Sequence, residues 1–193
     1  FRSMHDFREV GPTFVLFAPR VWEQIAADVR ARIMDASPLK RRLYEYGMKV
    51  GLEALDKGKR SRLADLLLFR ALRDRLGFSN LRSAATGGAA LGPETFRFFM
   101  AMGVPLRQLY GQTETLGAYT IHAHGDVDFD TVGKPFGKDI EVRIDNPDHN
   151  GVGEIVTRHP NMFAGYFRNE AAGAADIRDG WMHTGDAGYF DKR

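Results

Sequence analysis

Residues 81–110 alternate between strand-like and helix-like sequence, and they constrain the fold more than any other part of the chain. Leu81 to Thr86 is a short apolar run typical of a strand, and Gly87-Gly88 indicates a tight turn. Pro93 to Met102 predicts a helix, because proline stands in its first turn and Gly103 follows its end. Leu106 to Tyr110 is the next strand. This order predicts two parallel strands joined by a right-handed crossover.

The residues before this unit predict a further strand and three helices. Thr13 to Ala18 is an apolar run closed by Pro19, which favours a strand buried on both faces. Apolar residues then recur at helical spacing in three stretches, at residues 21–33, 39–50 and 63–72. Ser61 is a candidate N-cap of the third helix, and Gly77 stands where a C-terminal glycine belongs. We expect the core to contain the aromatic residues Trp22, Phe96, Phe98 and Phe99.

The sequence changes character after residue 116, where glycine, aspartate and short alternating runs become frequent. Residues 140–144 alternate between apolar and polar side chains, and residues 154–157 are a second short run rich in β-branched residues, which together are typical of strands in hairpins. We therefore predict an α/β fold, with helices on a mostly parallel sheet in residues 1–116 and a β-rich subdomain in residues 117–193. The boundary is expected between residues 116 and 130.

Composition excludes several classes of site. The chain contains no cysteine, which excludes disulfides, thiolate metal sites and cysteine nucleophiles and fits a reducing, cytoplasmic setting. Apolar runs stay well short of the roughly 18 to 20 residues of a membrane-spanning helix.

The net charge of +2 is unevenly distributed, because residues 1–75 carry +6 and residues 76–193 carry −4. The basic residues lie beside helical apolar periodicity, which is typical of solvent-exposed helix faces: Arg41, Arg42, Lys57, Lys59, Arg60 and Arg62. The alternative is a module that docks on an anionic membrane through residues 20–75. We expect small-molecule substrates and no nucleic acid, with peripheral membrane contact as the open alternative.

The segment Tyr110-Gly111-Gln112-Thr113-Glu114 follows a predicted strand at the carboxyl edge of the sheet, where α/β folds bind ligands. An aromatic ring can stack on a base, and a hydroxyl can bond a phosphate. A carboxylate can hold Mg²⁺ together with the phosphates of a substrate. These groups favour a nucleotide site, although Tyr110 in the core and Glu114 as a helix-start charge would explain the same residues structurally.

A second candidate segment, Gly180-Trp181-Met182-His183-Thr184-Gly185-Asp186, combines a turn with a strand and presents one carboxylate, that of Asp186. A carboxylate that accepts hydrogen bonds from ribose hydroxyls is a familiar element of nucleotide sites. Gly153-Glu154 and Gly165-Tyr166 lie between the two candidate segments.

These motifs, in this order, resemble the adenylate-forming (AMP-binding) superfamily, which includes acyl-CoA synthetases, luciferases and the adenylation domains of peptide synthetases. The matching segments are Gly87-Gly88-Ala89, Tyr110 to Glu114, Gly153-Glu154 with Gly165-Tyr166, and Trp181 to Asp186. Residues 19–23 and 37–76 resemble the long-chain fatty acid:CoA ligase branch in particular. The resemblance spans nearly the whole chain and implies part of a large N-terminal domain, with a distorted, barrel-like β subdomain.

The resemblance implies a role for each motif. Thr113 would contact the α-phosphate and Glu114 would bind Mg²⁺, so these two are the expected catalytic residues. Tyr110 would stack on adenine, Gly87 to Ala89 would line the adenine and acyl pockets, and Asp186 would bind the ribose hydroxyls. The expected nucleotide-binding residues are Gly87, Gly88, Ala89, Tyr110, Gly111, Gln112, Thr113 and Asp186.

The implied reaction uses ATP, Mg²⁺ and coenzyme A as a cosubstrate. A fatty carboxylate attacks the α-phosphate of ATP, and the thiol of coenzyme A then attacks the acyl-adenylate. The family's phosphate loop and its C-terminal domain with a catalytic lysine are absent from these residues, so we expect activity in a longer parent enzyme and not in this piece alone. The alternatives are another adenylate-forming enzyme, either a ligase for an aryl or medium-chain acid or a luciferase-like enzyme, and a non-catalytic module that binds a nucleotide or docks on a membrane.

His122 and His124, followed by Asp126, Asp128 and Asp130, allow a metal hypothesis, because alternate residues of a strand face the same side. The pattern fails as a calcium loop, since Thr131 stands where glycine is needed. We do not expect a metal there.

Overall fold

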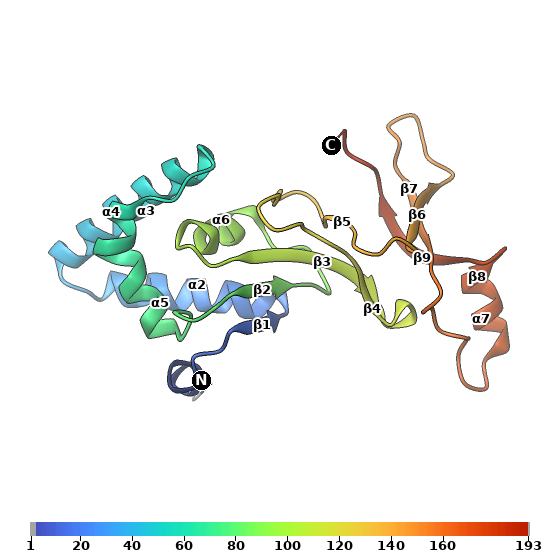
Figure 1. The fold of residues 1–193 in the computed structure, drawn as a ribbon, viewed down its shortest axis with the longest axis horizontal. Helices are drawn as coiled ribbons and strands as arrows, with labels where there is room; N and C mark the ends of the chain where they lie inside the picture. The colour runs from blue at the N-terminus through green and yellow to red at the C-terminus, as the bar shows by residue number, and fades with distance from the viewer. Residues whose placement is uncertain (1–2, 193) are drawn as a thin grey trace. The chain divides into compact units, whose positions relative to one another are not determined.

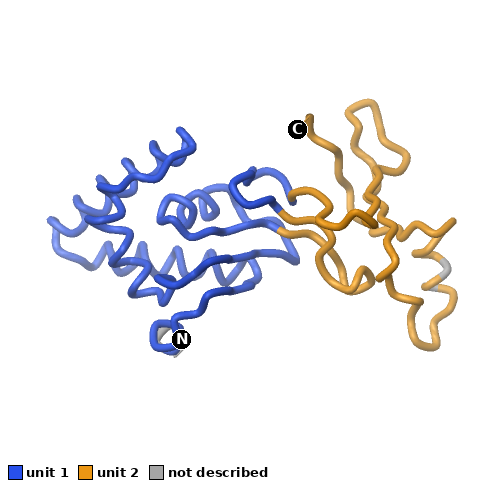
Figure 2. Tube along the Cα trace, in the orientation of Figure 1, with its two compact units in different colours: residues 1–108, 122–132 blue, residues 109–121, 133–193 orange. Residues whose placement is uncertain are grey.

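The computed structural model describes residues 3–192, which form two compact units (Figures 1 and 2). Unit 1 contains residues up to 108 together with 122–132, and unit 2 contains residues 109–121 and 133 onward. Because residues 122–132 return to unit 1, the two units interleave along the chain. The predicted subdomain division near residue 116 stays a prediction about the parent enzyme.

Unit 1 contains a parallel sheet with helices packed against it (Figure 1). Its strands are β1 (Phe14–Phe17), β2 (Ser83–Thr86) and the first part of β3 (Leu106–Gln112), with β1 pairing β2 and β2 pairing β3. Its helices are α1 (Ser3–Val10), α2 (Pro19–Met34), α3 (Pro38–Asp56), α4 (Arg62–Ala64), α5 (Arg70–Leu76) and α6 (Pro93–Ala101). The predicted strand, glycine turn, helix and strand are therefore confirmed as β2, α6 and β3.

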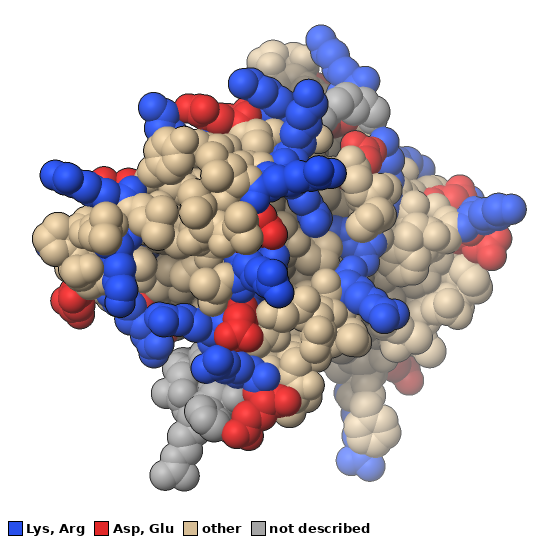
Figure 3. All heavy atoms as spheres, turned by 60° about the vertical axis from the view of Figure 1, so that its left-hand side comes forward, with Lys and Arg blue, Asp and Glu red and all other residues tan. Residues whose placement is uncertain are grey.

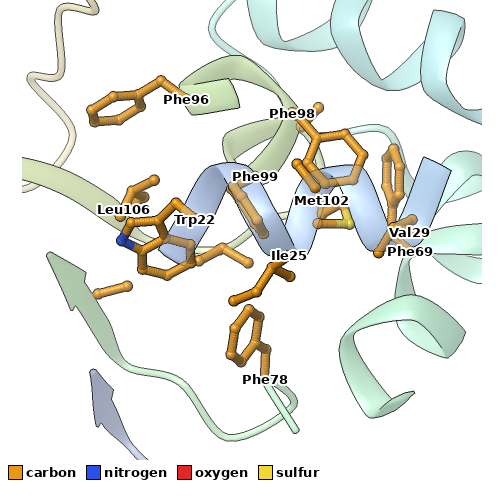
Figure 4. Packing of buried hydrophobic residues seen from close by; sticks show 14 of the residues in the cluster. Trp22, Ile25, Val29, Phe69, Phe78, Phe96, Phe98, Phe99, Met102 and Leu106 are labelled. Atoms are coloured by element: carbon orange, nitrogen blue, oxygen red, sulfur yellow. The ribbon is translucent and has the colours of Figure 1, made fainter. Parts of the chain in front are cut away.

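The core of unit 1 lies between α2, α6 and the sheet (Figure 4). Trp22 of α2 is fully buried, packs edge-on against Phe99 with a centroid distance of 4.7 Å, and donates its indole N–H to the carbonyl of Ala85 at 3.3 Å. Burial of aromatic side chains provides much of the hydrophobic stabilisation of such a core. The prediction that the aromatic residues of α2 and α6 belong to the core is confirmed.

The first strand differs from its prediction. β1 was expected to be buried on both faces, but it lies at the edge of the sheet. Phe14 and Leu16 are 57% and 55% exposed, whereas Val15 between them is 4% exposed. Only one face of this strand packs on the core, because the alternation of side chains along a strand puts Phe14 and Leu16 on the other face.

The third predicted helix is interrupted by a π-helical turn, Asp65–Phe69, between α4 and α5. Its predicted ends are confirmed, since the hydroxyl of Ser61 accepts from the N–H of Ala64 and Gly77 has φ +72°. The wide turn points two consecutive residues, Leu68 and Phe69, into the core, while Leu66 is 71% exposed.

Two glycines of α3 accommodate this π-helical turn. A Cβ added to Gly47 would meet the side chain of Leu68, and one added to Gly51 would overlap the ring of Phe69. Because the two glycines stand four residues apart, they lie on the same face of α3. The absence of a side chain at both positions therefore lets α3 pack closely on the turn.

The basic residues of the helices lie on the surface. Arg42, Lys57, Lys59, Arg60 and Arg62 are exposed, and Figure 3 shows Lys and Arg dispersed over the face that it presents, with Asp and Glu among them. Within residues 3–192, the structure has no helix long and apolar enough to cross a membrane.

Unit 2 is rich in β-structure. The second part of β3 pairs antiparallel with β4 (Gly117–Ile121), which pairs with β5 (Lys134–Pro135). A separate antiparallel sheet has the order β6 (Glu141–Asp145), β7 (Gly153–Arg158), β9 (Trp181–Gly188) and β8 (Ile177–Arg178). The predicted strands at 140–144 and 154–157 are confirmed as β6 and β7, and helix α7 (Glu170–Asp176) was not expected. The α/β fold followed by β-rich structure is confirmed.

The packing of α3 on the π-helical turn predicts that Gly51→Leu lowers the free energy of unfolding by about 1 to 3 kcal/mol, because the new side chain must displace Phe69. Urea denaturation measures this change. Glu53→Leu, at an exposed position of the same helix, is the control and should change stability by no more than about 0.5 kcal/mol. Equal stability of the two variants would contradict the close packing of α3.

Candidate functional site

The segment Tyr110 to Glu114 forms a hairpin corner in unit 2. β3 ends at Gln112, a 3₁₀ turn spans Thr113–Thr115, and β4 returns antiparallel. The register shifts between Tyr110 and Gly111, where a Cβ on Gly111 would overlap the backbone of Gly117. Glycine at position 111 is therefore required by the close approach of the two strands.

The turn is fixed by Thr115, which is 3% exposed. Its hydroxyl oxygen accepts from the N–H of Gln112 at 2.9 Å and lies 2.8 Å from the carbonyl of Gly117. These contacts leave Thr113 and Glu114 at the end of the hairpin.

The second candidate segment forms a bulge on β9. Val156 of β7 pairs with His183, and Glu154 pairs with Ala187, so that Thr184, Gly185 and Asp186 lie opposite the single residue Ile155. The Thr184 hydroxyl donates to the carbonyl of Ile155 at 2.7 Å, and Gly185 has φ +72°. Such bulges redirect a side chain out of the regular pleat, and here the redirected residue is Asp186.

The carboxylate of Glu154 holds this bulge. One oxygen accepts from the backbone N–H of Gly185 at 2.9 Å, and the other lies 2.8 Å from Nδ1 of His183. The hydrogen bond from His183 lowers the pKa of Glu154 below its usual value, which keeps the carboxylate charged. The Gly153-Glu154 motif had no assigned role in the sequence, and the structure gives it this one.

Tyr110 and Asp186 lie together, although 76 positions separate them in the sequence. The Tyr110 hydroxyl donates to Oδ2 of Asp186 at 2.6 Å. Burial and the hydrogen bond to Asp186 raise the pKa of Tyr110 to about 12, so its hydroxyl remains a donor at neutral pH. The Tyr110 ring also packs edge-on against Tyr119, with a centroid distance of 5.3 Å.

Gln112 joins the same group. Its side-chain nitrogen donates to the carbonyl of Thr184 at 2.9 Å and to Oδ2 of Asp186 at 3.1 Å. The two candidate segments, which the sequence placed far apart, are thus directly hydrogen-bonded to each other.

Glu114 interacts with the Gly165-Tyr166 motif. The Tyr166 hydroxyl lies 2.8 Å from Oε1 of Glu114 and 2.9 Å from Oδ2 of Asp176, at the end of α7. The hydrogen bonds to these two carboxylates raise the pKa of Tyr166 above its ordinary value, that to Glu114 being the larger cause. Asp176 was not found from the sequence, because its role depends on α7.

A pocket of about 540 Å³ lies beside these groups, within the size range of small-molecule sites. Its lining residues all belong to unit 2: Gln112, Thr113, Glu114, Glu154, Tyr166, Asp176, Arg178, Met182, His183, Thr184 and Gly185. The pocket therefore brings together the predicted Gln112, Thr113 and Glu114 with the bulge that carries Asp186.

The donor set of this pocket fits Mg²⁺, which takes oxygen ligands and is commonly held by one or two carboxylates together with substrate phosphates. Glu114 provides such a carboxylate. Among residues 3–192, no group of three or more His, Asp or Glu side chains is placed so that it could hold a metal ion.

The segment Gly87-Gly88-Ala89 lies in unit 1, directly after β2. The buried side chain of Gln108 holds the loop that follows, since its nitrogen donates to the carbonyl of Ala89 at 2.9 Å and its oxygen accepts from the N–H of Leu91 at 3.3 Å. Gly88 has φ +85°, which favours glycine. Sequence reasoning did not identify Gln108, which supports this loop from the neighbouring strand.

His122, considered above as a metal ligand, is 2% exposed and structurally engaged in unit 1. Its Nδ1 accepts from the N–H of Gln108 at 3.0 Å, and its Nε2 lies 3.0 Å from the hydroxyl of Thr131. Burial lowers the pKa of His122, so the ring is neutral at neutral pH.

The chain is similar to curated long-chain acyl-CoA ligases. It is 32% identical over 194 residues to the long-chain-fatty-acid–CoA ligase ACSBG2 of Gallus gallus, which covers 96% of this chain and 25% of that protein. It is 33% identical to long chain acyl-CoA synthetase 1 of Arabidopsis thaliana, over 95% of this chain and 30% of that protein. The chain thus spans less than a third of the length of these relatives.

Solved structures share the fold. The unliganded o-succinylbenzoate coenzyme A synthetase of Bacillus subtilis matches 99% of this chain and 32% of its own, with a TM-score of 0.61 and 19% identity. The same enzyme in complex with its acyl-adenylate intermediate matches 58% of this chain and 24% of its own, with a TM-score of 0.53 and 29% identity. The AMP-binding enzyme family itself matches residues 1–167, most of the chain, and the chain belongs to that family.

Proposed function

We propose that the chain is part of a ligase that activates a long-chain fatty acid with ATP and transfers the acyl group to coenzyme A. The observation that carries this proposal is the hydrogen-bonded joining of Tyr110, Gln112 and Asp186 beside the pocket that contains Thr113 and Glu114. The similarity to long-chain ligases over nearly all of the chain supports the class of acid.

The chemistry requires two displacements. A carboxylate oxygen of the fatty acid attacks the α-phosphorus of ATP, and the bond to pyrophosphate breaks to leave the acyl-adenylate. The thiolate of coenzyme A then attacks the acyl carbon, and AMP leaves. Since both reactants of the first step are anions, the protein has to position them and offset their charge.

The residues of unit 2 have separate roles in this scheme. The Tyr110 ring stacks on adenine, Asp186 accepts from the ribose hydroxyls, and Thr113 donates to the α-phosphate. Glu114 would hold Mg²⁺, which neutralises phosphate charge when bound. Gly87, Gly88 and Ala89 are proposed to line the adenine and acyl pockets.

The class of acid is tested by pyrophosphate exchange in the full-length parent. ATP–pyrophosphate exchange should depend on long-chain fatty acids and should be much weaker with aryl or medium-chain acids. Exchange that is driven best by an aryl acid would identify a different adenylate-forming ligase, and the absence of exchange with every acid would favour a non-catalytic module.

Asp186→Ala in the parent should raise the KM for ATP by about tenfold and leave the KM for fatty acid nearly unchanged, because the ribose contact is remote from the acyl group. Steady-state kinetics with each substrate varied in turn measures both values. Asp139→Ala, at an exposed aspartate, is the control. An equal rise in both KM values would show that Asp186 does not serve the ribose.

Glu114→Gln keeps the shape of the side chain and removes its charge. Adenylation should slow by a factor on the order of 10² or more, because one electrostatic contact to the transition state supplies a few kcal/mol. The thioester step, started from preformed acyl-adenylate, should slow less, and ATP affinity without Mg²⁺ should barely change. Glu23→Gln, at an exposed position of α2, is the control. Full-rate adenylation by the Glu114 variant at limiting Mg²⁺ would rule out the metal role.

Peripheral membrane contact is a second proposal, favoured by exposed leucines beside basic residues on the helices of unit 1. Leu39 and Leu66 are 77% and 71% exposed, and Lys40 and Arg62 nearby are exposed as well. The parent should sediment with anionic liposomes at low salt and be released as salt rises. A smaller fraction of the parent should sediment with the liposomes when it carries both Lys57→Glu and Lys59→Glu. No sedimentation at any salt concentration would contradict the contact.

A further inference from the structure

The two oxygens of the Asp186 carboxylate differ in the hydrogen bonds that they accept. Its Oδ2 accepts both protein hydrogen bonds, from the Tyr110 hydroxyl at 2.6 Å and from Gln112 at 3.1 Å. Its Oδ1 accepts none from residues 3–192, and the residue is exposed. One oxygen is therefore fixed by the protein, and the other is available to a ligand.

Gln112 is committed to the protein through its amide nitrogen. That nitrogen carries two hydrogens, and its two acceptors are the carbonyl of Thr184 and Oδ2 of Asp186. The amide thus fastens the end of β3 to the bulge of β9. That Gln112 also contacts the nucleotide itself stays a prediction.

Tyr110 combines two functions in one side chain. Its hydroxyl bonds Asp186, and its ring is packed edge-on against Tyr119. The base and sugar of a nucleotide are joined by a single bond, so a site that recognises both needs its ring and its carboxylate at a fixed separation. The hydroxyl bond supplies that fixed separation.

We propose that Gln112 and the Tyr110 hydroxyl are positioning residues that orient the free oxygen of Asp186 toward the ribose hydroxyls, and that they determine the preference for ribonucleotides over deoxynucleotides. The inference rests on the proposed function, since it takes a nucleotide as the ligand. It predicts that removal of either donor selectively weakens the recognition of ribose, even though the aromatic ring of residue 110 and Asp186 are both kept.

The experiment measures the dissociation constants of AMP and 2′,3′-dideoxyAMP by calorimetry in the full-length parent. Gln112→Glu replaces the donor by a carboxylate that faces Thr184 and Asp186, and Tyr110→Phe removes only the hydroxyl. Both variants should raise the dissociation constant of AMP about tenfold, because hydrogen bonds to a charged group are lost. They should raise the dissociation constant of dideoxyAMP by less than about twofold.

Matched controls make the same changes elsewhere. Gln24→Glu places a carboxylate beside Asp28 on the exposed face of α2, and Tyr46→Phe removes a hydroxyl from a half-exposed ring on α3. Both should bind the two nucleotides like the wild type. Gln112→Met removes the donors without adding charge, and should show the same selective loss even if Gln112→Glu lowers thermal stability.

The outcomes separate the two proposals. If the Gln112 and Tyr110 variants bind both nucleotides equally more weakly, or bind AMP as the wild type does, the positioning role is overturned. A wild-type parent that prefers AMP over dideoxyAMP would still uphold the nucleotide site. A wild-type parent that binds neither nucleotide, or binds both equally, would overturn the proposed ribose contact and this inference with it.

Discussion

The position of Asp186 depends on a carboxylate of the neighbouring strand. Glu154 accepts from the backbone of Gly185 and from His183, and these two bonds close the bulge in which three residues of β9 face one residue of β7. In a regular antiparallel pair, side chains alternate between the two faces of the sheet. The bulge interrupts this alternation and directs Asp186 toward Tyr110 and Gln112.

Four carboxylates lie in or beside the pocket, and they differ in how their charge is compensated. Glu154 is bonded by His183 and a backbone N–H, and Asp186 has two side-chain donors. Glu114 and Asp176 share the single hydroxyl proton of Tyr166, so at any moment one of them lacks that donor. The guanidinium-bearing Arg178 lines the same pocket as this pair.

The parts of the fold that the sequence predicted are those with local signals. Glycine and proline mark the ends of α6, and Ser61 and Gly77 mark the ends of the third helical stretch, because caps and turns depend on neighbouring residues. The π-helical turn, in contrast, packs against two glycines of α3, a long-range contact that the local pattern of leucines does not report. Helix α7 has a central glycine and small side chains, so no apolar periodicity indicated it.

The candidate site was predicted as motifs and not as an arrangement. Tyr110, Glu114 and Asp186 were identified from residue type and from resemblance, but Glu154 is a single polar residue at the start of a strand-like run and has no local signal of a special role. Its role depends on the register between β7 and β9, and register is set by pairing across the sheet. The contacts of Tyr166 with Glu114 and Asp176 depend likewise on residues distant in sequence.

Gly111 links the close approach of β3 and β4 to the hydrogen bonds that Asp186 accepts. Tyr110 and Gln112 flank it, and alternate residues of a strand point to the same side, which is how both side chains reach Asp186. Gly111 itself meets the backbone of β4, where a side chain would force the strands apart. Because a displacement of β3 at this point would move both donors together, the close approach of two strands fixes the hydrogen bonds on which the orientation of Asp186 depends.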